Sequence, residues 1–216
     1  MAHAENRQAA LLQQGLDRLG LQATQLQRAA LLDYLGLLQK WNRAYNLSAV
    51  RDPEQMVSHH LLDCLAVLPS LDRHLSRAAR VLDVGSGAGL PGVVLAAMRP
   101  DWQVTCVDAV AKKVSFVRQV ALELALPNLA AEHARVEQMP PWGADAVVSR
   151  AFASLADFCA GTARHLAPGG CWIAMKGRVP EDEIAVLPAG VEVFHVEPLQ
   201  VPGLAAQRCL VWMRSR

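Results

Sequence analysis

The sequence feature with the clearest chemical meaning is the glycine-rich string DVGSGAGLPG at residues 83–92. Gly85, Gly87 and Gly89 can adopt backbone angles that are closed to other residues, and they carry no Cβ that would hold a ligand away. The string follows the strand-like RVLDV (80–84) and precedes an apolar helical stretch, whose first turn offers free N–H groups. This order predicts a loop that passes closely under a nucleotide-like ligand.

Two classes of ligand use such a loop. Dinucleotides bring a pyrophosphate to a G-x-G-x-x-G loop. Here the spacing is G-x-G-x-G and Asp83 precedes the first glycine, which favours S-adenosylmethionine (SAM), a ligand with an amino-acid end and no phosphate. Asp108 ends the next predicted strand and is expected to accept the ribose hydroxyls, or else to cap the helix predicted at 111–126. Beyond the third strand, a backbone N–H of Val136 or Glu137 is expected at the adenine edge, although an exposed acidic loop fits this stretch equally well.

Ser149 and Arg150 lie at the end of the fourth predicted strand, where open α/β sheets bind ligands. The sequence around them therefore indicates which kind of methyl acceptor the site can take. No Asp/Asn-Pro-Pro-aromatic motif follows to hold an exocyclic amine, and no cysteine pair is placed to attack a pyrimidine ring. N7 of guanine is an acceptor that requires neither motif. Its free lone pair needs no general base, and alignment of the two reactants provides most of the rate enhancement. Methylation at N7 builds positive charge on the purine. Arg150 is therefore expected to pair with the SAM carboxylate, a phosphate or guanine O6, the alternative being a surface ion pair.

The elements that would position these residues divide the chain into a helical extension at 1–78 and a methyltransferase domain at 79–216, packed as one unit. In the extension, Asp52 and Pro53 predict a helix start, with Gln55 at the reciprocal position of a capping box. Before it, an apolar stripe recurs at helical spacing and is formed by Leu31, Leu35, Leu38, Trp41 and Tyr45. Trp41 is expected in the core rather than as a base-stacking platform.

The second part alternates strands and helices, which predicts an α/β fold with a mainly parallel sheet. Strands are expected at 80–84, 103–109, 129–133, 145–149 and 169–177, and helices up to Met98, at 111–126 and at 154–166. The last two strands, 191–200 and 207–215, have no helix between them. This antiparallel hairpin is typical of the Rossmann-like (class I) SAM-dependent methyltransferase sheet and unusual for dinucleotide dehydrogenases.

Composition narrows the class further. The 216 residues are 52% hydrophobic with a formal net charge of +1, so any contact with nucleic acid must come from a local patch. The five cysteines occur singly and are expected as reduced core thiols. His59 and His60 are adjacent and point apart on a helix, so no metal site is expected. No apolar run is long enough to cross a bilayer, which predicts a soluble, cytoplasmic protein without membrane contact.

Taken together, the chain closely resembles the bacterial 16S rRNA guanine-N7 methyltransferases called glucose-inhibited division protein B. The resemblance extends from about Leu37 to the C-terminus. It is carried by KWNRAYNL (40–47), VRDPEQM (50–56), HHLLDCL (59–65), DVGSGAGLPG (83–92), SRAFASL (149–155), MKGRVPEDEI (175–184) and LQVPGL (199–204). It implies SAM as the methyl donor and guanine 527, in the 530 loop of 16S rRNA, as the acceptor, within the small subunit or an assembly intermediate.

The resemblance also implies cofactor contacts at Gly85, Leu90, Val136, Glu137 and Arg150. With that substrate, Arg150 and Lys176 are expected to position the reactants. The residues expected to contact RNA, several of them through phosphates, are Arg43, Asn46, Lys176, Arg178 and Arg208. For these cations the alternative is a solvated face, and Lys112 and Lys113 are assigned to plain helix surface.

Three other functions stay open from the sequence. A SAM-dependent methyltransferase of small molecules fits the near-neutral charge. A non-catalytic RNA- or nucleotide-binding module could keep the glycine loop. An NAD dehydrogenase is disfavoured by the loop spacing and the terminal hairpin.

Overall fold

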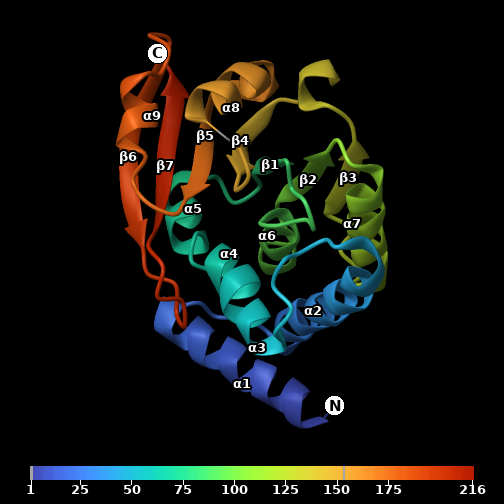
Figure 1. The fold of residues 1–216 in the computed structure, drawn as a ribbon. Coiled ribbons are helices and arrows are strands. Elements are labelled where there is room, and N and C mark those ends of the chain that lie inside the picture. The colour runs from blue at the N-terminus through green and yellow to red at the C-terminus, as the bar shows by residue number, and fades with distance from the viewer. Residues whose placement is uncertain (1, 153) are drawn as a thin grey trace.

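The computed structural model describes residues 2–152 and 154–216. The N-terminal part is helical, as the sequence predicts, and is folded over one side of an α/β unit (Figure 1). Its helices are α1 (Ala2–Leu19), α2 (Gln25–Tyr45), α3 (Pro53–Met56), α4 (Asp63–Leu65) and α5 (Leu68–His74). A π-helical turn at Val57–Leu62 joins α3 to α4, so the helix predicted from Asp52 onward is present but is not a regular α-helix.

Local signals explain where these helices begin. The Asp52 carboxylate accepts a hydrogen bond from the backbone N–H of Gln55 (2.8 Å), and Pro53 occupies the first helical position. The structure shows this half of the predicted capping box. A complete capping box lies instead between Thr24 and Gln27 at the start of α2.

The strands of the described residues form one seven-stranded sheet in the order β3-β2-β1-β4-β5-β7-β6. They are β1 (Arg80–Val84), β2 (Gln103–Asp108), β3 (Leu129–His133), β4 (Ala144–Ser149), β5 (Leu166–Lys176), β6 (Val191–Leu199) and β7 (Arg208–Ser215). The first five pair in parallel, and β7 is inserted antiparallel between β5 and β6. Each of the seven strands predicted from the sequence is confirmed, including the antiparallel hairpin.

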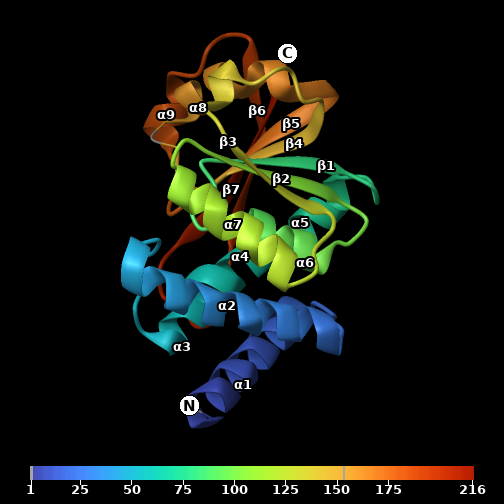
Figure 2. The same cartoon turned by 90° about the vertical axis from the view of Figure 1, so that its right-hand side faces the viewer.

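Helices cover both faces of the sheet (Figure 2). Those of the α/β unit are α6 (Gly92–Met98), α7 (Ala111–Glu123), α8 (Leu155–Thr162) and α9 (Glu181–Ala185). On the face with α6 and α7, α2 and α1 add a further layer, and one buried cluster runs from Leu12 and Leu31 to Trp212. On the other face α8 covers a second core around Phe158 and Trp172.

Two helices end earlier than the sequence predicts, and one short helix was not predicted. The helix predicted at 111–126 ends at Glu123. The helix predicted at 154–166 ends at Thr162 and continues as a 3-10 turn, Ala163–His165. The short helix α9 was not predicted. Its first turn is acidic, with Glu181, Asp182 and Glu183, which favours a helix start electrostatically.

Candidate functional site

The glycine loop between β1 and α6 lies at the carboxyl edge of the sheet. Gly85, Gly87 and Gly89 have φ angles of +68°, +60° and +83°, in the left-handed region that favours glycine. The Gly85 N–H donates to the Val107 carbonyl (2.8 Å), which ties the loop to the end of β2. A Cβ at Gly89 would lie 2.6 Å from Cγ2 of Val93, so a larger residue would push the loop away from α6.

Two carboxylates, of Asp83 and Asp108, stabilise this loop by accepting backbone hydrogen bonds. Asp83 is fully buried, and its Oδ2 accepts the N–H of Gly92 (2.7 Å) at the start of α6. Burial raises the pKa of Asp83 to about 7, and the hydrogen bond from Gly92 opposes that shift. Asp83 therefore fixes the angle between strand and helix and is not a ligand-facing group.

Asp108, at the end of β2, is also buried but keeps 7% of its surface exposed. Its Oδ2 accepts the N–H of Gly87 (2.9 Å) and its Oδ1 the N–H of Val110 (2.8 Å), with Lys113 Nζ 3.5 Å from Oδ2. The carboxylate thus organises both the glycine loop and the turn into α7. The assignment of Lys113 to plain helix surface is wrong, because the side chain bends back to this carboxylate. Lys112 is exposed, as predicted.

A cavity of about 220 Å³ opens beside these groups. It is lined by Val84, Gly85, Val107, Asp108, Ala109, Ala134, Arg135, Val136, Glu137 and Phe152. Four of the residues predicted to bind the cofactor, Gly85, Asp108, Val136 and Glu137, meet here although they come from three different strand ends. The Leu90 side chain is buried, and Gly87 and Gly89 shape the loop without lining the cavity.

A second and larger cavity, of about 370 Å³, is lined in part by Arg150, two residues before Phe152 of the first cavity. Its lining residues are Val50, His59, His60, Asp63, Arg150, Met175, Lys176, Gly177 and Arg208. Lys176 and Arg208, two of the predicted RNA contacts, converge here with Arg150. Arg150 was predicted to contact the cofactor, but it does not line the smaller cavity; its guanidinium is drawn instead to Asp63. Arg43 and Asn46, at the end of α2, and Arg178, in an exposed turn after β5, do not line this cavity. The Asn46 Oδ1 accepts a hydrogen bond from Arg51 (2.6 Å).

The three cations of this cavity each have a carboxylate partner. Asp63 accepts from Arg150 Nη1 (3.2 Å) and from Arg208 Nε (2.7 Å), and Lys176 Nζ lies 2.9 Å from Glu183 Oε2. Sequence patterns alone assigned no role to Asp63 or Glu183. Asp63 lies within the string HHLLDCL (59–65), but nothing in that string indicates which arginines the carboxylate meets.

His60 also lines the second cavity but carries no charge there. Its Nε2 lies 2.8 Å from Ser48 Oγ, and burial, together with the nearby Arg150, lowers its pKa to about 4. The imidazole is therefore neutral at pH 7. In the part of the chain that the structure describes, no group of three or more metal-ligating side chains occurs, and no helix is long and apolar enough to span a membrane.

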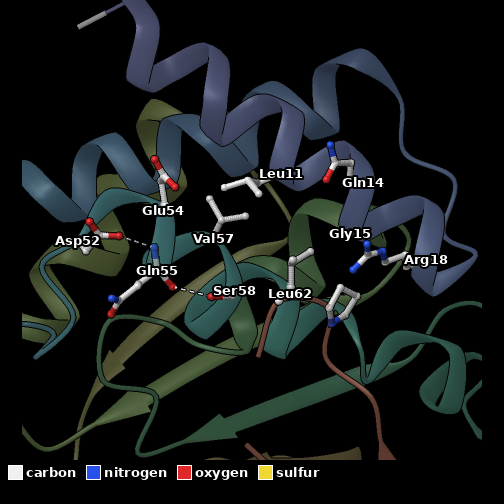
Figure 3. A pocket seen from close by; sticks show the side chains of 12 residues that line it. Leu11, Gln14, Gly15, Arg18, Asp52, Glu54, Gln55, Val57, Ser58 and Leu62 are labelled. Atoms are coloured by element: carbon white, nitrogen blue, oxygen red, sulfur yellow. Dashed lines mark hydrogen bonds between the residues drawn. The ribbon is translucent and has the colours of Figure 1, made fainter. Parts of the chain in front are cut away.

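A third cavity, also of about 370 Å³, lies where α1 packs on the π-helical turn and the β6–β7 connection (Figure 3). Leu11, Val57 and Leu62 form its apolar wall, while Arg18 and Glu54 lie toward opposite ends. It shares no lining residue with the two cavities at the sheet edge.

The cysteine and aromatic side chains have structural roles. All five cysteines are free, and only Cys171 is not fully buried. Trp41 packs partly buried against the core, with its ring centroid 5.5 Å from that of Phe116. Four of the five cysteines are thus core thiols, as predicted, and Trp41 packs partly into the core.

Comparison with known proteins gives a family match and several close relatives. The model of the family described as rRNA small subunit methyltransferase G matches residues 27–211. The ribosomal RNA small subunit methyltransferase G of Leptothrix cholodnii is 59% identical over 203 residues, covering 94% of this chain and 93% of that protein. The protein of the same name from Methylibium petroleiphilum is 56% identical over 206 residues, covering 95% and 93%.

Solved structures share the fold at low sequence identity. A SAM dependent methyltransferase from Aquifex aeolicus has a TM-score of 0.59 at 20% identity, covering 78% of this chain and 96% of that one. TrmN from Thermus thermophilus has a TM-score of 0.57, also at 20% identity, covering 81% of this chain and 53% of that one. The seven-stranded sheet with its antiparallel end is thus similar to that of known methyltransferases.

Proposed function

This chain belongs to the rRNA small subunit methyltransferase G family, and from that premise we propose that it methylates N7 of guanine 527 in 16S rRNA. The protein is a SAM-dependent methyltransferase of small-subunit ribosomal RNA. Family membership favours this function over the small-molecule methyltransferase, the non-catalytic module and the NAD dehydrogenase. The base, its position and the residues that contact it belong to the proposal.

One observation carries the assignment of the site. Arg150 and Phe152 lie two residues apart after β4 and line different cavities, Phe152 the smaller one and Arg150 the larger one. The smaller cavity has the glycine loop, the Asp108 carboxylate and the turn at Val136 and Glu137, a set that fits a nucleoside. The larger cavity is lined by cations and fits part of an RNA strand. A donor and an acceptor bound in the two cavities would meet near Arg150 and Phe152.

In the smaller cavity, Gly85 and Asp108 would hold the adenosine part of SAM, and Val136 and Glu137 would face its base. When bound, SAM supplies a methyl group on a sulfonium sulfur. The acceptor nitrogen would take this methyl group from the side opposite the sulfur, which would leave as the neutral thioether. The chain's residues then have three tasks: to align the two reactants, to exclude water and to leave the attacking nitrogen unprotonated. No general base is required for a ring nitrogen with a free lone pair.

In the larger cavity, two carboxylates and a neutral histidine reduce the positive charge that an acceptor becoming cationic would meet. Its His60 is neutral, and the charge of Arg150 is partly offset by Asp63. Lys176 pairs with Glu183, and its Nζ lies 3.5 Å from the carbonyl oxygen of Phe152, a residue that lines the smaller cavity. Lys176 therefore links the two cavities. Arg43, Asn46 and Arg178 are proposed as outer RNA contacts. Since ribosomal subunits are cytoplasmic, we place the protein there.

The test is to map N7-methylguanine in 16S rRNA from cells that lack this gene and from cells that carry it. Loss of the modification at the 530 loop, and its return with the gene, is the expected result. Purified protein with labelled SAM should then be offered naked 16S rRNA and 30S subunits from the deleted strain. An unchanged 530 loop in the deleted strain would refute the proposed position.

A further inference from the structure

The Asp63 carboxylate joins three segments that are far apart in the sequence. It lies in α4, directly after the π-helical turn, and only 3% of the residue is exposed. Arg150 reaches it from the end of β4 and Arg208 from the start of β7. The His59 carbonyl accepts a second hydrogen bond from Arg150 Nη1 (3.2 Å). The extension is thus linked to the sheet by an Arg–Asp–Arg cluster.

This cluster leaves guanidinium donors available. Each guanidinium carries five N–H groups. Arg150 uses Nη1 on Asp63 and His59, and Arg208 uses Nε on Asp63 and Nη1 on the Gln207 carbonyl. Among residues 2–152 and 154–216, the structure gives no acceptor for Nη2 of either arginine. Their side chains remain 29% and 24% exposed, and both line the larger cavity.

The charges of the cluster do not cancel. Lys176 is matched by Glu183, while two arginines share the single carboxylate of Asp63. One positive charge therefore remains on the floor of the cavity, beside neutral His60. An anion that accepts several hydrogen bonds would satisfy both the charge and the free donors, which a neutral carbonyl oxygen would not.

We propose that Asp63 is a positioning residue, which holds Arg150 and Arg208 so that their free N–H groups bind one backbone phosphate of the RNA. This proposal rests on the proposed function, since it needs an RNA strand in the larger cavity. A phosphate bound there would also offset the positive charge of the arginines close to a purine that becomes cationic on methylation. Asp63 touches neither reactant and acts through the two guanidiniums.

Removing the Asp63 carboxylate should change the RNA affinity in the direction opposite to that expected from the change in net charge alone. Removing a carboxylate near an RNA site should by charge alone tighten binding and steepen its salt dependence. If Asp63 positions the arginines, Asp63→Asn should instead weaken binding about tenfold or more, as expected when one charge-assisted hydrogen bond is removed. The slope of log affinity against log salt should become shallower by about 0.7 to 0.9 for each phosphate that the variant no longer binds.

The experiment measures binding of unmethylated 16S rRNA to the protein loaded with S-adenosylhomocysteine, from about 50 to about 200 mM KCl. The wild-type protein is measured first, and failure to bind or methylate this RNA counts against the proposed function, not the Asp63 cluster. Glu181→Gln is the matched control, because it removes an exposed carboxylate of α9, two residues before Glu183. Its binding should be unchanged or slightly tighter.

SAM affinity, measured by calorimetry, should be unchanged in Asp63→Asn. Tighter or equal RNA binding by this variant, with SAM affinity kept, would overturn the proposal. If the variant loses SAM binding, Arg208→Lys decides, because it keeps the charge and removes the planar fork. Weaker RNA binding and a shallower slope are expected for it, and wild-type values would reject a role for the positioned guanidinium.

Discussion

Two aspartates at neighbouring strand ends show how burial separates the roles of one residue type. Asp83 is enclosed and supports the turn into α6, while Asp108 keeps a small exposed surface at the cavity beside the glycine loop. Their sequence contexts are alike, since each ends or nearly ends a strand. Complete burial confines Asp83 to a structural contact, while Asp108 combines its contacts to the loop with an exposed edge at the cavity.

The raised pKa of Asp83 has a consequence for stability. A carboxyl whose folded-state pKa is about 7, against 3.8 as its ordinary value, stabilises the fold most below pH 4. That contribution is lost as pH rises through 7, and amounts to roughly 4 kcal/mol between the two limits. Asp83→Asn should remove this pH dependence, whatever constant effect the amide has.

Denaturant unfolding of both proteins at about pH 5 and about pH 8 checks this prediction. The wild type should lose stability relative to Asp83→Asn at the higher pH. Asp101→Asn, on an exposed surface pair with Arg77, is the control and should follow the wild type. A difference between wild type and Asp83→Asn that is equal at the two pH values would contradict the burial argument.

Asp108 should contribute directly to cofactor affinity. Asp108→Ala removes the predicted ribose contact and also releases the N–H groups of Gly87 and Val110. SAM binding should weaken by about 1–3 kcal/mol, as expected for the removal of hydrogen bonds to a charged group. Calorimetric titration with SAM measures this, with Asp101→Ala as a control that keeps wild-type affinity. Unchanged affinity of Asp108→Ala would remove this residue from the cofactor site.

At the scale of elements, the π-helical turn at Val57–Leu62 lies between α1 on one side and the larger cavity at the sheet edge on the other. It carries His59 and His60 to the larger cavity, and on its other side Leu62 packs under Gly15 of α1. A Cβ at Gly15 would lie 2.6 Å from Cδ1 of Leu62 and even closer to its Cδ2. The absence of a side chain at Gly15 therefore sets how closely α1 approaches this turn.

Two glycine-to-alanine substitutions separate this packing from helix propensity. Gly36, inside α2, has nothing within 4 Å of its added Cβ, so Gly36→Ala should stabilise the protein by about 1 kcal/mol. Gly15→Ala gains the same propensity but must displace Leu62, so it should destabilise. The free energies of unfolding in denaturant give the comparison. Equal stabilisation by both would show that α1 does not pack closely on the turn.

At the scale of the whole molecule, the two sheet-edge cavities are lined by residues that lie between Val50 and Arg208 in the sequence. The smaller one uses the ends of β1, β2 and β3 and the segment after β4. The larger one uses the extension, β5 and the start of β7. Since both lie at the carboxyl edge of one sheet, the rigidity of that sheet fixes the distance between the two cavities.

Ligand-induced stabilisation tests the cofactor class on the intact protein. SAM at about 100 times its Kd should raise the free energy of unfolding by about 2.7 kcal/mol, because it binds only the folded state. NADH at the same concentration should leave stability unchanged, since the loop has no dinucleotide spacing. Thermal unfolding with each ligand provides the measurement. Stabilisation by NADH and not by SAM would reverse the assignment.

The sequence by itself determined the order of strands and helices, the glycine loop and the class of cofactor. These follow from local signals, namely apolar periodicity, glycines that accept positive φ angles, and the caps of helices. It also placed Arg150, Lys176 and Arg208 near one edge of the sheet, because strand ends share that edge.

Only the tertiary structure decided which carboxylates meet these cations. Asp63 pairs with Arg150 and Arg208, Glu183 with Lys176, and Asp108 with Lys113. The Asp63 contacts depend on how a π-helical turn is oriented against strands that are far away in the chain, and the Glu183 contact depends on the short helix α9. Spacing along the sequence does not encode that orientation, since it results from packing of the whole core.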